Sequence, residues 1–128
     1  MIVPMDELGW LGFSACHPSL LCAQLYGERL GEWTVAVDVA ECVLRIEAFN
    51  PMVRTQALRL LGCARAALGE GPAACDAAER AAAEAAKAKY VWLEKRSLED
   101  LLKWCEAGEA EGVRARLREV ARRMAALS

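Results

Sequence analysis

Arginine side chains are the first candidates for binding chemistry in this sequence. Arg54, Arg59 and Arg65 fall within one stretch of helical pattern, together with Gln56. A guanidinium group is suited to bidentate capture of a carboxylate or a phosphate. We therefore predict that these four residues bind a ligand. The alternative interpretation is that they are ordinary arginines on a solvated helix face.

A second set of arginines lies near the C-terminus. Arg114, Arg118 and Arg122 are four residues apart, so they share one face of a helix. Such a row can bind phosphates with salt-dependent affinity. It also suits a terminal helix that needs a polar outer face, with cations near its C-terminal dipole. We favour the terminal-helix interpretation, because a net charge of −2 does not favour nucleic acid as a partner. Phosphate or nucleic-acid contact through this helix is kept as an alternative function.

Catalytic and metal chemistry have few candidate residues. Cys16 and His17 are adjacent in sequence, which does not give the geometry of a nucleophile and its base. The chain has six cysteines without a Cys-x-x-Cys pair and one histidine, which does not match a zinc site. No phosphate-binding glycine loop or nucleophile elbow is present. We expect no enzyme, no cofactor and no metal, with the cysteines as reduced, packed thiols in the cytoplasm.

The composition indicates which elements must position these residues. The chain has 128 residues, the length of one domain, and 25 of them are Ala and 17 are Leu. Val, Ile and Thr together number 13, too few for a domain built on a sheet. Ala and Leu lead the helix-propensity scale. The composition therefore predicts an all-α fold.

Prolines and glycines divide the chain into expected helices. After an N-terminal extension, 1–17, the predicted helices are 18–30, 33–49, 51–68, 73–95, 97–107 and 111–127. Ser97 is the expected N-cap of the fifth helix. The four tryptophans, Trp10, Trp33, Trp92 and Trp104, are expected to be packing anchors.

The stretch from Leu8 to Gly27 contains no charged residue. Pro18 and several polar residues interrupt it, so we do not expect it to span a membrane. The N-terminus also lacks the basic start of a secretory leader. An alternative function for the chain is a structural subunit that docks on a neighbour through this stretch.

Three of the breaks recur at similar intervals. Gly31-Glu32, Gly69-Glu70 and Gly108-Glu109 are 38 and 39 residues apart, which is typical of a helical repeat. The central unit resembles the tetratricopeptide repeat in these residues: Leu58, Leu61-Gly62, Gly69-Glu70, Ala74 and Ala81. The first unit is similar through Gly31-Glu32-Trp33 and Ala36, and the third through Trp104 and Gly108. The period exceeds the roughly 34 residues of that family, Gln24 replaces a glycine, and no proline follows Ala81.

The resemblance implies about three antiparallel helix hairpins, 18–50, 51–96 and 97–127, stacked as a short right-handed solenoid. In such a fold the first helices line a concave surface, and Arg59 lies where these repeats often contact peptides. The family's clamp for acidic C-terminal peptides has Asn where this chain has Cys63, so that specificity is not carried over. The expected function is a non-enzymatic scaffold module that binds a peptide or partner helix on its concave face.

Overall fold

A computed structural model describes residues 18–46 and 50–127, and these residues form six α-helices and no strand. The all-α prediction is therefore confirmed. The helices are α1 (Pro18–Leu30), α2 (Trp33–Ile46), α3 (Pro51–Ala67), α4 (Gly71–Lys87), α5 (Val91–Trp104) and α6 (Ala107–Leu127).

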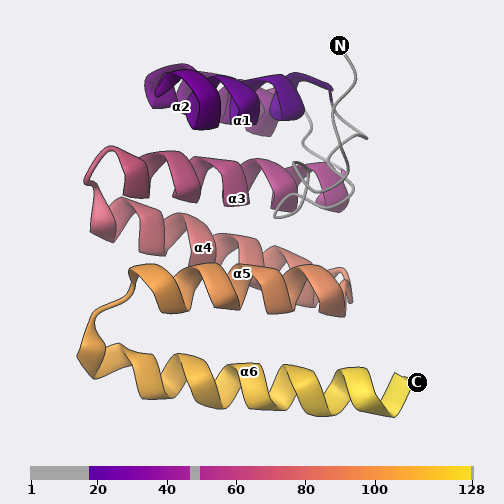
Figure 1. Ribbon diagram of the computed structural model, residues 1–128. Coiled ribbons are helices and arrows are strands. Elements are labelled where there is room, and N and C mark those ends of the chain that lie inside the picture. Colours follow the sequence, from indigo (N-terminus) through magenta and orange to yellow (C-terminus); the bar gives the residue numbers. More distant parts are fainter. Residues whose placement is uncertain (1–17, 47–49, 128) are drawn as a thin grey trace.

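The helices form one stack in chain order, with α1 and α2 at one end and α6 at the other (Figure 1). Each helix packs against the next one in the chain. In addition, α3 contacts both α1 and α5. Short connections make consecutive helices antiparallel. Helix α3 lies between α1 and α2 on one side and α4 and α5 on the other (Figure 1).

Local sequence explains the boundaries of the first three helices. Asn50 caps α3, because its side-chain oxygen accepts a hydrogen bond from the backbone N–H of Val53 at 3.2 Å, and Pro51 occupies the first turn. Gly31 and Gly69 end α1 and α3 with φ angles of 71° and 81°. That left-handed conformation favours glycine, and it explains why both residues mark turns.

The predicted fourth and fifth helices are wrong in their boundaries. Helix α4 ends at Lys87, and α5 begins at Val91, so the second hairpin ends well before residue 96. The break is at Lys89, which has a φ of 63° without being glycine. Ser97 is therefore not an N-cap. It lies inside α5, fully buried, and its hydroxyl donates a hydrogen bond to the Leu93 carbonyl at 2.8 Å.

The predicted start of the sixth helix is also wrong. Helix α6 begins at Ala107, so Gly108 lies in its first turn and does not form the break. The chain turns instead at Cys105, whose backbone is extended (φ −75°, ψ 161°). The predicted extension of α2 to residue 49 lies outside the described residues.

Two hydrophobic clusters form the core, and the alanines of α4 contribute to both. Ala77 and Ala81 face the cluster built from α1, α2 and α3, while Ala78 and Ala82 face the cluster with α5 and α6. Small side chains on both sides let α4 approach its neighbours closely. Alanine content in this chain therefore reflects a helix that is buried on two faces.

Gly62 of α3 is another point of close approach. A Cβ atom there would lie 2.7 Å from Cζ3 of Trp104 on α5 and 3.3 Å from the carbonyl oxygen of Ala74 on α4. Trp104 is thus a packing anchor, as predicted, and Trp33 packs over Gly27 in the same way. Trp92 is not, because it is 46% exposed and has Lys95 and Arg96 near its ring.

No helix in the part of the chain that the structure describes is long and apolar enough to cross a membrane. Predictions for Cys16, His17, Trp10 and the first part of the charge-free stretch concern residues outside those described.

Candidate functional site

The four predicted ligand-binding residues all lie on α3, but on two different sides of it. Arg59 bonds to Asp100 of α5, and Gln56 lies nearly one turn before Arg59 on the same side. Arg54 bonds instead to residues of α2 and α4. Arg65 bonds to a residue of α2 and to one in the turn between α3 and α4. The structure therefore divides the predicted site into a buried pair of residues and a more accessible pair.

The first pair belongs to the interior of the protein. Arg59 is 2% exposed, and its Nε donates a hydrogen bond to Oδ2 of Asp100 at 2.9 Å. Burial lowers the pKa of Arg59 and raises the pKa of Asp100, and in both cases it outweighs the attraction of the partner. Gln56 is fully buried, and its amide oxygen and nitrogen have no hydrogen-bond partner among the residues that the structure describes. A ligand reaches Arg59 and Gln56 only if neighbouring helices move.

The second pair connects three helices. Arg54 donates to Glu84 of α4 at 3.0 Å and to the Leu44 carbonyl of α2 at 2.9 Å. Arg65 donates to Glu41 of α2 at 3.0 Å and to Glu70, in the turn after α3, at 2.8 Å. The hydrogen bond to Glu70 is the main reason that the pKa of Arg65 is raised, with Glu41 adding to it. Arg65 is permanently charged and held in place.

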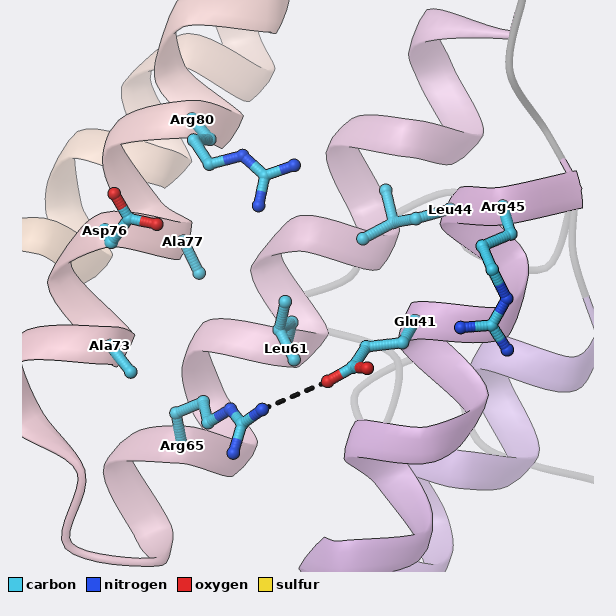
Figure 2. A pocket seen from close by; sticks show the side chains of 9 residues that line it. All are labelled: Glu41, Leu44, Arg45, Leu61, Arg65, Ala73, Asp76, Ala77 and Arg80. Atoms are coloured by element: carbon cyan, nitrogen blue, oxygen red, sulfur yellow. Dashed lines mark hydrogen bonds and ion pairs between the residues drawn. The ribbon is translucent and has the colours of Figure 1, made fainter.

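Arg65 also lines a groove of about 410 Å³ that runs between α2 and α4, over α3. Figure 2 shows Arg65 and Arg80 reaching into this space from α3 and α4, with Glu41 opposite Arg65 on α2. The lining residues are Glu41, Leu44, Arg45, Leu61, Arg65, Ala73, Asp76, Ala77 and Arg80. We call this feature the α2–α4 groove.

The walls of the α2–α4 groove carry two exposed arginines. Arg45 projects from α2 and Arg80 from α4 (Figure 2). Within residues 18–46 and 50–127, neither guanidinium group has an ion-pair partner. Leu44, Leu61 and Ala77 form an apolar floor between them. The groove can therefore accommodate an apolar group and place anionic groups beside it.

Sequence reasoning did not identify Arg45 and Arg80. The available signal is their helical spacing: Glu41 and Arg45 are four residues apart on α2, as are Asp76 and Arg80 on α4. That spacing shows that each pair shares a helix face. It does not show that the faces of α2 and α4 border one groove, which depends on how the helices pack.

The arginines of α6 are paired with acidic residues. Glu111 pairs with Arg114 and Arg118, and Glu119 pairs with Arg122, all on α6 itself. Two further arginines connect α6 to the rest of the protein: Arg116 binds Glu79 of α4, and Arg123 binds Glu94 of α5, each with two hydrogen bonds. The terminal helix thus has a polar, internally compensated outer face.

The cysteines of the described residues are free thiols in different surroundings. Cys22 and Cys42 are exposed, so the prediction that all thiols are packed is wrong for these two. Burial raises the pKa of the Cys63 thiol to about 11, and Cys75 donates a hydrogen bond to the Trp104 carbonyl at 3.1 Å. Among residues 18–46 and 50–127, no group of His, Cys, Asp or Glu side chains is arranged to hold a metal ion.

The chain matches no protein-family model, and no curated protein or solved structure shows significant similarity to it. The α2–α4 groove must therefore be interpreted from its own geometry. That geometry combines a recessed apolar floor with arginines from three successive helices.

Proposed function

We propose that this chain is a non-enzymatic protein–protein interaction module, built as a tetratricopeptide-like helical repeat, that binds a segment of a partner protein in the α2–α4 groove. The observation that carries the proposal is the combination of Leu44 and Leu61 on the floor with Arg45 and Arg80 on the walls. An apolar centre with polar groups around it is typical of protein recognition sites.

The packing of the helices supports the repeat architecture. The second helix of each hairpin begins at Trp33, Gly71 and Ala107. Contacts of α3 with α1 and α5 are those expected when the first helices of successive hairpins lie side by side. A short right-handed solenoid is the arrangement that we propose for these hairpins.

The proposed site differs from the concave face formed by the first helices. Arg59 and Gln56, which were expected on that face, are buried. Arg54 and Arg65 point toward the side where α2 and α4 lie. Binding would be passive: apolar contact with the floor contributes affinity, and the arginines orient the bound segment.

A second candidate function is a structural subunit of a larger assembly. It is favoured by the outer side of α1, where Tyr26 is 50% and Leu30 64% exposed. Cys22 and Leu25 lie beside them in a shallow apolar depression. Sedimentation velocity over a range of concentrations tests this candidate directly, and a monomer at every concentration would count against self-association through α1.

The proposed binding role can be tested without knowing the partner. A selection from displayed random peptides, with the purified chain as bait, should enrich peptides that depend on the groove. Ala73→Trp places an indole in the groove from an exposed position on α4, whereas Ala86→Trp adds the same group to an exposed position outside it. We expect enriched peptides to lose binding to Ala73→Trp and to keep it for Ala86→Trp. Peptides that bind both variants equally would contradict the proposal.

A further inference from the structure

We infer that the occupant of the α2–α4 groove is an acidic protein segment, in which Asp or Glu side chains flank an apolar side chain. The carboxylates would bind Arg45 and Arg80, and the apolar side chain would lie against Leu61. This inference rests on the proposed function and specifies the chemistry of the partner. Its support comes from the charges of the groove walls and the shape of the floor.

The charges of the groove are unevenly neutralised. Arg65 already has two carboxylate partners, Glu41 at 3.0 Å and Glu70 at 2.8 Å. Arg45 and Arg80 have no ion pair among the described residues, although Glu41 and Asp76 lie one turn before them on the same helices. Exposed ion pairs at that spacing contribute little. Two guanidinium groups, on opposite walls, are therefore available to an incoming carboxylate.

Apolar side chains lie at the centre of the groove. Leu61 is 8% exposed at the centre of Figure 2, and the small residues Ala73 and Ala77 line the α4 side. Small residues there leave the recess open between the two helices. An apolar residue between two acidic ones would displace water from this recess, while the two carboxylates contact Arg45 and Arg80 on the walls.

The acidic residues of the groove favour a peptide over a phosphate-rich ligand. Glu41 and Asp76 repel any anion, but they repel a nucleic-acid backbone, with a charge on every nucleotide, more than a peptide whose acidic residues flank an apolar one. The same carboxylates can accept hydrogen bonds from peptide N–H groups, which a phosphate backbone lacks. The arginines of α6 differ from Arg45 and Arg80 in that they already have carboxylate partners: Glu111 pairs with Arg114 and Arg118, and Glu119 pairs with Arg122.

Glu41 acts as an internal competitor in this arrangement. Its carboxylate accepts a hydrogen bond from Nη2 of Arg65 across the groove (Figure 2), where a ligand carboxylate would otherwise bind. Removal of its charge frees part of Arg65 and lowers the repulsion of an acidic ligand. Glu41→Gln should therefore strengthen binding, whereas loss of Arg45 and Arg80 should weaken it.

Fluorescence anisotropy with defined probes tests the inference. The first probe is a labelled peptide of repeating Glu-Leu-Glu units, and the second is the same peptide with Gln in place of Glu. We expect the acidic peptide to bind, and Arg45→Gln/Arg80→Gln to weaken it about tenfold or more. Glu41→Gln should tighten it several-fold. Arg114→Gln/Arg118→Gln is the matched control, because it removes the same charge from exposed positions on α6.

Each other outcome overturns the inference. If the Gln peptide binds as tightly as the Glu peptide, the carboxylates have no role in binding. If Arg114→Gln/Arg118→Gln loses as much affinity as Arg45→Gln/Arg80→Gln, the effect is one of net charge alone. Tighter binding of a single-stranded oligonucleotide of equal charge, with the same dependence on Arg45 and Arg80, would assign the groove to nucleic acid. If the random selection enriches groove-dependent peptides that lack acidic residues, the proposed function stands and only this inference fails.

Discussion

Arg59 of α3 and Asp100 of α5 form a buried ion pair, with 2.9 Å between Nε and Oδ2, across 41 positions of sequence. The pair joins the second hairpin to the third in the interior of the stack. Burial opposes both charges, as the raised pKa of Asp100 and the lowered pKa of Arg59 indicate. Each side chain therefore depends on the other to remain charged inside the protein.

Removal of one member of this pair should destabilise the fold. Asp100→Ala leaves an unpaired guanidinium in the core, and we expect the free energy of unfolding to fall by about 3–5 kcal/mol. Replacement of both residues, Arg59→Met with Asp100→Leu, should recover most of that loss. Urea denaturation of the three proteins measures the effect, and a double variant no more stable than Asp100→Ala would contradict it.

Gly62 should not tolerate a side chain. Gly62→Ala places a Cβ 2.7 Å from the Trp104 ring, and we expect a net loss of about 1–2 kcal/mol despite the better helix propensity of Ala. Gly112→Ala on α6 is the control, since nothing lies within 4 Å of its Cβ position. That variant should gain about 0.5–1 kcal/mol. A stabilised Gly62→Ala would show that α3, α4 and α5 are less closely packed than described.

The first three helices could be predicted because their boundaries fall on residues with strong backbone preferences. Pro18, Gly31, Asn50-Pro51 and Gly69 all stand at the ends that the structure shows. The break between α4 and α5 falls on Ala88, Lys89 and Tyr90, none of which is typical of a turn. Ala85, Ala88 and Trp92 continue the helical spacing of α4 across this break, so the two helices looked like one long helix.

The site was predicted only in part, for a related reason. Spacing places Arg54, Arg59 and Arg65 on one helix, but the side that each faces depends on its partners. Arg59 is buried because Asp100 lies on a helix 41 residues away in sequence, and Arg65 lines a groove because α2 and α4 flank α3. Sequence patterns within one helix do not contain that information.

Lys89 should be a point of stored backbone strain. Its φ of 63° is unfavourable for a residue with a side chain. We expect Lys89→Gly to raise the free energy of unfolding by about 0.5–1 kcal/mol, because glycine adopts this conformation freely. Lys89→Val, with a branched side chain, should lower it by at least about 1 kcal/mol. Thermal and urea unfolding check both values, and the reverse order of the two variants would contradict the description of this turn.

The thiols should differ in reactivity. Burial raises the pKa of Cys63 to about 11, so below that pH Cys63 remains mostly a protonated thiol in the folded protein. A pKa of about 11 in place of the ordinary value of 9.0 lowers the fraction of thiolate, which is the reactive form, about a hundredfold at neutral pH. Alkylation followed by mass spectrometry should modify the exposed Cys22 and Cys42 first and Cys63 last. Cys63 should become reactive only as the pH approaches 11 or the chain unfolds, and rapid labelling at neutral pH would contradict this environment.

The central claim is that the arginines of the α2–α4 groove contact an acidic segment of a partner. NMR spectra that resolve the arginine Nε–Hε groups test it most directly, during titration with the Glu-Leu-Glu peptide. We expect saturable shifts at Arg45, Arg65 and Arg80, and none at the control residues Arg114 and Arg118. Shifts confined to α6, or equal at all exposed arginines, would contradict the account.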